Sequence, residues 1–101
     1  MIRKVIISSK AQNSLVEIAG YIENKFSVNA RIIFMKKFRD SVLIASENPK
    51  IFPLSLNDKK LHKCVVTKQT SFLYKFNPTK LEIISIFDTR HNPNKIKKDI
   101  K

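Results

Sequence analysis

Two histidines and several cationic side chains are the residues of this chain best suited to chemistry. His62 and Lys63 lie in one β-rich run, and Arg90 and His91 follow another. RNA cleavage through its own 2′-hydroxyl needs a base, an acid for the leaving oxygen, and cations that hold the pentavalent phosphate. Either histidine can serve as base or acid, and Lys63 and Arg90 can clamp the phosphate. These four residues are the candidate catalytic set if the chain is a nuclease.

The same residues have a simpler interpretation as ordinary surface groups. Lysine and histidine at the strand ends of a basic protein commonly contact only solvent, and Arg90 can pair with Asp88 or close the turn. A single glycine excludes a glycine-rich phosphate loop, and the single cysteine, Cys64, leaves no paired-cysteine metal site. We expect no metal and no cofactor, and whether the chain is an enzyme stays open at this point.

The charge of the chain points to its partners. Twenty Lys and Arg face eight Asp and Glu, a formal net charge of +12. Such a balance suits a polyanion or an acidic protein, although an AT-rich genome also enriches lysine. No apolar run approaches the roughly 20 residues of a membrane span, and one cysteine forms no internal disulfide. We therefore expect a cytoplasmic protein that does not insert into membranes.

Three short runs in the second half of the chain predict strands. Residues 61–67, 70–76 and 81–87 are rich in β-branched and aromatic side chains. Short links, one of them containing Asn77-Pro78, make neighbouring strands antiparallel, so the runs form a meander. The last run is apolar on both sides and is expected at the centre of the sheet. Residues 3–8 predict one further strand at the start of the chain.

The segment between the first strand and the meander predicts two helices. Apolar residues at helical spacing indicate a helix over residues 10–25, begun by a capping box of Ser9 and Gln12. Ser27 is the expected cap of a second helix, which Asn48-Pro49 ends. Residues 1–101 are thus one α+β domain: a strand, an antiparallel αα-hairpin and a meander. The hairpin covers one sheet face, and the open basic face is the expected working surface.

The second helix carries more apolar surface than one sheet face needs. One explanation is a broad buried face. The other is a docking surface for a partner. The candidate partner-binding residues are Ile32, Met35, Leu43 and Lys68.

Five segments occur in an order that is typical of one protein family. They are Ala11-x3-Leu15-x2-Ile18-x2-Tyr21-Ile22, Ala30-x3-Phe34-x3-Phe38, Asn48-Pro49 with Phe52-Pro53, Phe72-Leu73-Tyr74, and Ile86-Phe87-Asp88-Thr89-Arg90-His91-Asn92-Pro93. Over nearly the whole chain they resemble the RelE/ParE toxin superfamily, the toxic halves of bacterial type II toxin–antitoxin operons. The last segment is fairly specific, whereas the others are mostly core pattern.

The resemblance implies two possible activities. RelE-like members cut mRNA on the ribosome with basic residues of the middle strands and an arginine after the last strand. The matching positions here are His62, Cys64, Ser71 and Arg90. Cys64 and Ser71 cannot hold a phosphate as Lys or Arg would, although His91 can compensate. ParE-like members have no known catalytic set and are thought to poison DNA gyrase by binding it, and we expect this chain to be ParE-like.

The resemblance also implies a protein partner. Toxins of this kind, which serve in plasmid stabilisation, are neutralised by a cognate antitoxin. An acidic or apolar C-terminal segment of the antitoxin is expected to cover the basic sheet face or the second helix. The charge of +12 suits this, because opposite charge speeds the encounter of two proteins.

Overall fold

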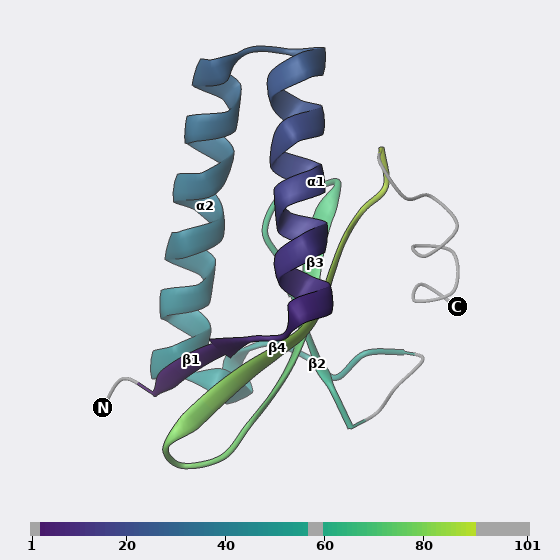
Figure 1. Ribbon diagram of the computed structural model, residues 1–101. Helices are drawn as coiled ribbons and strands as arrows, with labels where there is room; N and C mark the ends of the chain where they lie inside the picture. Colours follow the sequence, from purple (N-terminus) through teal and green to yellow (C-terminus); the bar gives the residue numbers. More distant parts are fainter. Residues whose placement is uncertain (1–2, 57–59, 91–101) are drawn as a thin grey trace.

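The computed structural model describes residues 3–56 and 60–90. Its elements follow the predicted α+β order (Figure 1). They are β1 (Lys4–Ile7), α1 (Ser9–Lys25), α2 (Val28–Glu47), the short 3-10 helix η1 (Pro49–Ile51), β2 (His62–Val65), β3 (Thr70–Phe76) and β4 (Lys80–Asp88). The predicted strand, helical hairpin and meander are therefore confirmed.

The described strands form one sheet in the order β1-β4-β3-β2. β4 is central, as its apolar composition predicted. It pairs antiparallel with β3 and parallel with β1. A parallel pair needs a long crossover connection, and the α1–α2 hairpin supplies part of it. β1 and β2 are the two edges of the sheet.

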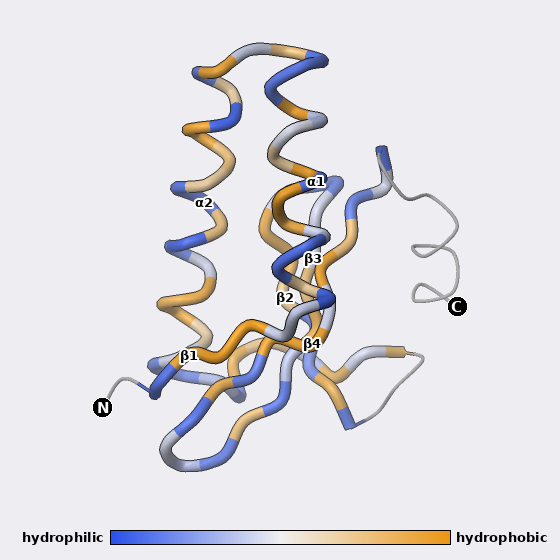
Figure 2. Tube along the Cα trace, viewed as in Figure 1, coloured by the Kyte–Doolittle hydropathy of each residue, from blue (hydrophilic) through white to orange (hydrophobic). Residues whose placement is uncertain are grey.

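Both helices pack on one face of the sheet, and the core lies between the helices and that face. The register places Cys64, Phe72 and Ile86 side by side on adjacent strands. All three are buried in one cluster with helix residues such as Phe38, whose ring lies 5.7 Å from that of Phe72 in an edge-to-face arrangement. Hydrophobic and hydrophilic segments alternate along both helices (Figure 2), as expected of helices with one buried face.

A β-bulge changes which face the residues of β4 occupy. Strict alternation predicts Ile84 and Ile86 on one face and Ile83 and Phe87 on the other. The register instead pairs Leu73 with Ser85 and Tyr74 with Ile83, so Ile84 is an extra residue. As a result Ile83 and Ile86 both belong to the core under the helices. Phe87 pairs with Ser71 on the opposite face, so the alternation prediction was wrong beyond Ile83.

The cap of α1 lies one residue earlier than predicted. Ser8, not Ser9, is the N-cap: its Oγ accepts a hydrogen bond from the amide of Ala11 at 3.0 Å and donates to the carbonyl of Ile84 at 2.8 Å. Gln12 donates to the carbonyl of Ile7 instead of closing a capping box. Because β1 ends at Ile7, Ser8 is the residue that caps the start of α1. The predicted Ser27 cap and the end of α2 at Asn48 are confirmed.

We expect Ser8→Ala to lower the free energy of unfolding by about 1–2 kcal/mol, since it removes a helix cap and a hydrogen bond from α1 to β4. Urea denaturation measures the change. Ser9→Ala is the matched control, because Ser9 is exposed in the first turn of α1. Its effect should stay within about 0.5 kcal/mol. Equal losses in the two variants would contradict the assignment of Ser8 as the cap.

Candidate functional site

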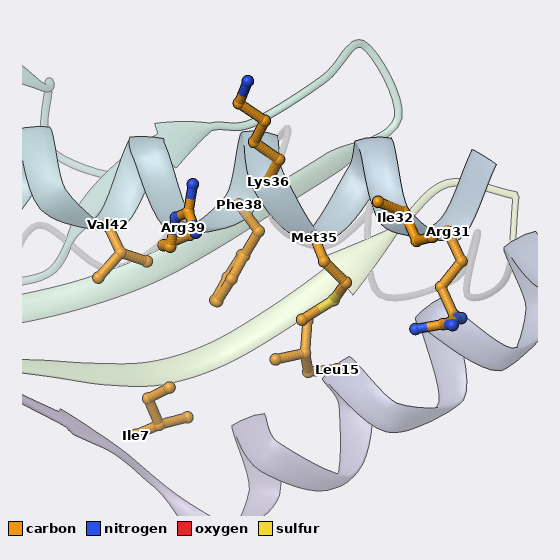
Figure 3. Close-up of a pocket in the computed structure, with 9 residues that line it drawn as sticks. All are labelled: Ile7, Leu15, Arg31, Ile32, Met35, Lys36, Phe38, Arg39 and Val42. Atoms are coloured by element: carbon orange, nitrogen blue, oxygen red, sulfur yellow. The ribbon is translucent and has the colours of Figure 1, made fainter. Parts of the chain in front are cut away.

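An apolar groove opens beside α2, on the side that faces α1 and β1 (Figure 3). Its volume is about 670 Å³. Three elements supply its apolar walls, with the side chains of Ile7, Leu15, Ile32, Met35, Phe38 and Val42. Phe38 belongs to the core, whereas the side chain of Ile32 is 54% exposed. The groove therefore connects the core with the surface.

Three cations line the same groove. Arg31 donates from Nε to Glu23 Oε1 at 2.6 Å and so ties α2 to α1. Arg39 Nη2 lies 3.8 Å from Asp40 Oδ1, and both side chains are exposed, so solvent screens this pair. Lys36 adds a third positive charge. A groove lined by apolar side chains and cations is suited to a peptide segment that carries both apolar and acidic residues.

The structure brings together two of the four predicted partner-binding residues. Ile32 and Met35 both line the groove. Leu43 is exposed on α2 but is not part of the groove lining. Lys68 is exposed in the link between β2 and β3, away from it. Sequence reasoning missed Ile7 and Leu15, which reach the groove only through the packing of β1 and α1 against α2.

His62 and Lys63 point to opposite faces of the sheet. His62 pairs with Tyr74 in the register, and the two rings stack with centroids 5.4 Å apart. Its Nδ1 lies 2.7 Å from the carbonyl oxygen of Phe52, which can only accept, so Nδ1 carries the proton and donates it. Lys63 lies on the face without helices, with Nζ 5.6 Å from the ring centroid of Phe87. These two neighbours in sequence do not share a surface.

Arg90 is held in place by a buried carboxylate. Asp88 is fully buried and accepts hydrogen bonds from the Thr70 hydroxyl, from the backbone amide of Arg90 at 2.8 Å and from Arg90 Nη2 at 3.0 Å. Burial alone would raise the pKa of Asp88. Hydrogen bonds from Arg90 and Thr70, together with the charge of Arg90, outweigh burial and hold this pKa below its ordinary value. The simpler interpretation of Arg90, a pair with Asp88, is confirmed.

The described residues do not bring His62, Lys63 and Arg90 to one surface. His62 sits opposite Tyr74, whereas Arg90 lies beyond the pair of Thr70 and Asp88. Four residue steps along β3 separate these positions, about 13 Å. His91 lies outside the described residues. A catalytic role for these side chains stays a prediction that this geometry does not support.

Two of the three middle-strand positions that the RelE-like alternative would use are buried. Cys64 is fully buried under the helices, and Ser71 is buried on the other face of the sheet. Burial raises the pKa of the Cys64 thiol to about 12, although a hydrogen bond with Ser41 acts in the opposite direction. The thiol therefore stays protonated and offers neither a charge nor an exposed nucleophile.

No group of three His, Cys, Asp or Glu side chains that could hold a metal ion occurs within residues 3–56 and 60–90. In that same part of the chain, neither helix combines the length and the apolar character that a membrane crossing requires.

No family profile matches the chain, and no curated protein matches its sequence. Solved structures do match it in fold. The chromosomal ParDE toxin–antitoxin system of P. aeruginosa superposes with a TM-score of 0.72 at 9% identity, over 86% of this chain and 96% of that chain. A YoeB/ParE toxin from Agrobacterium tumefaciens gives 0.61 at 14% identity, over 84% and 97%. The E. coli DinJ-YafQ toxin-antitoxin complex gives 0.55 at 14%, over 89% and 96%. The chain therefore has the predicted RelE/ParE toxin fold.

Proposed function

We propose that this chain is the toxin of a type II toxin–antitoxin pair and that it acts in the cytoplasm by binding a protein, DNA gyrase, rather than by cutting RNA. The shared fold with the ParDE and YoeB/ParE structures supports the toxin role. We favour binding over cleavage because His62, Lys63 and Arg90 do not come together at one site. Cleavage needs base, acid and cations within contact of one phosphate, whereas Lys63 lies on the sheet face opposite His62, and about 13 Å along β3 separates the position of His62 from that of Arg90.

The groove beside α2 is the proposed docking site of the antitoxin. An amphipathic helix or extended segment can lay its apolar side chains onto Ile32 and Met35. Acidic residues beside them would meet Lys36 and Arg39. The DinJ-YafQ structure is a toxin-antitoxin complex of the same fold, which supports a partner of this kind. Neutralisation of this sort would suit a role in plasmid stabilisation.

Induced expression in E. coli tests the proposal. We expect growth arrest with an SOS response and intact mRNA in primer extension, and inhibition of gyrase supercoiling by the purified protein. Discrete cuts within codons that vanish in Arg90→Ala or His91→Ala would instead establish the RelE-like alternative. Circular dichroism must show that both variants are folded, because Arg90 is paired with Asp88. Normal growth would show that the chain is not toxic.

The cationic groove predicts fast association with the antitoxin at low salt. Lys36→Glu combined with Arg39→Glu should lower the on-rate about tenfold at low ionic strength, because it reverses the charge that steers an acidic partner. Stopped-flow mixing with the product of the adjacent reading frame measures this rate. Lys75→Glu with Lys80→Glu, exposed on the β3–β4 hairpin, is the control of equal charge. Equal slowing, or an on-rate indifferent to salt, would contradict local steering.

A further inference from the structure

A second cleft lies between the helical hairpin and the β2–β3 link. Its volume is about 300 Å³. The side chains that line it include Ile22, Phe26, Ile33, Lys37, Gln69 and Arg90. Ile32 lines the groove and Ile33 lines the cleft, and successive helical residues diverge by about 100°. The groove and the cleft share no lining residue and flank α2 on different sides.

Two large apolar side chains at this cleft are exposed and do not belong to the core cluster. Phe26 at the end of α1 is 57% exposed, and Ile33 is 49% exposed. Deeper in the cleft, Ile22 is buried and belongs to the core cluster. The cleft therefore offers an apolar floor that is continuous with the core and apolar side chains at its rim. A large apolar side chain of a partner would be desolvated there.

The side chain of Arg90 lies beside this apolar floor in a fixed orientation. The guanidinium of Arg90 lies 5.7 Å from the ring centroid of Phe26 and is held from behind by buried Asp88. Asp88 offsets much of its charge, and Lys37 on α2 adds a second cation. Because Arg90 is already oriented, binding a carboxylate there would cost little conformational entropy of the Arg90 side chain.

The chemistry of the cleft selects among possible occupants. A second copy of this chain would bring another +12, and residues 91–101 carry four lysines against one aspartate, so both have the wrong charge. For a nucleic-acid base, Arg90 covers one face of Phe26 and leaves at most one face for stacking. An acidic protein segment with one large apolar side chain satisfies both the floor and the cations.

We propose that this cleft is a second protein-docking site, which takes a large apolar side chain flanked by aspartate or glutamate from an acidic partner. The site goes beyond the antitoxin groove and would allow the chain to hold a second protein or a second segment of the same one. It does not depend on whether the chain is toxic.

A blocked pentapeptide with one phenylalanine between two pairs of glutamates is the probe for this site. Titrated into the ¹⁵N-labelled full chain, it should shift the amides of Ile33, Lys37 and Gln69 in a saturable way, with a dissociation constant on the order of 0.1–1 mM. Ile33→Glu should weaken binding at least about tenfold. Ile44→Glu is the matched control, because Ile44 is 48% exposed on α2 and lines neither the groove nor the cleft, and it should change affinity less than about twofold.

Other outcomes would overturn the proposal. Equal binding of a peptide with serine in place of phenylalanine would show attraction by charge alone. Loss of binding in Ile32→Glu but not in Ile33→Glu would place the peptide in the groove. Tighter binding of oligouridylate to the same amides would indicate a nucleic-acid site. The titration uses neither antitoxin nor toxicity, so normal growth on expression would refute the proposed function without affecting this result.

Discussion

Asp88→Asn is expected to lower the free energy of unfolding by about 2–4 kcal/mol. The buried carboxylate accepts hydrogen bonds from Thr70 and from both the backbone and the guanidinium of Arg90. An amide carries no charge and would turn an NH₂ group toward one of these donors, which leaves Arg90 uncompensated. Urea denaturation at pH 7 measures the loss. Asp40→Asn is the control, since its carboxylate is exposed 3.8 Å from Arg39, and should cost less than about 0.5 kcal/mol.

The pH dependence of this variant follows from the same contacts. The pKa of Asp88 in the folded chain lies below its ordinary value of 3.8. A carboxyl group with a lowered pKa stabilises the fold fully above pH 3.8, and this contribution disappears as the pH falls through the folded pKa. The difference between wild type and Asp88→Asn should therefore be constant near neutral pH and shrink in strong acid. A difference that grows on acidification would contradict the assigned direction.

The elements of the fold followed from periodicity, but two local features did not. The meander and the central position of β4 were visible as short β-branched runs, the last of them apolar on both sides. The bulge at Ile84 was not, because an extra apolar residue in an apolar run leaves the composition unchanged. The cap was misplaced because Ser9, three residues before Gln12, fits the capping-box motif, whereas Ser8, three residues before Ala11, does not. Only the end of β1 decides between them.

The candidate sites show where sequence spacing misleads. His62 and Lys63 were grouped because they are adjacent, yet adjacent residues of a strand point to opposite faces. Arg90 and Asp88 are two residues apart, and their pairing was a local alternative that the structure confirms. Of the excess apolar residues on α2, Ile32 and Leu43 are exposed, whereas Met35 is partly buried against the core. The groove itself depends on how three elements pack, which no single helical pattern contains.

Ile32→Glu is expected to weaken antitoxin binding at least about 100-fold. Ile32 lines the groove and is 54% exposed, so the change should leave the fold intact. A glutamate there would place a charge against the apolar groove and repel the acidic residues of the partner. Isothermal titration calorimetry with the cognate antitoxin measures the affinity. Coexpression adds a cellular measurement, because the variant should stop growth even when antitoxin is present.

The control for this prediction lies on the same helix. Ile44 is 48% exposed but lines neither the groove nor the cleft, so Ile44→Glu introduces the same charge at a similarly exposed position. It should stay within about threefold of the wild-type affinity and remain neutralised in cells. If the two variants lose affinity equally, the antitoxin does not select the groove and the added negative charge alone accounts for the effect. If Ile32→Glu is still neutralised, the antitoxin covers another surface, with the face of the sheet that has no helices as the next to test.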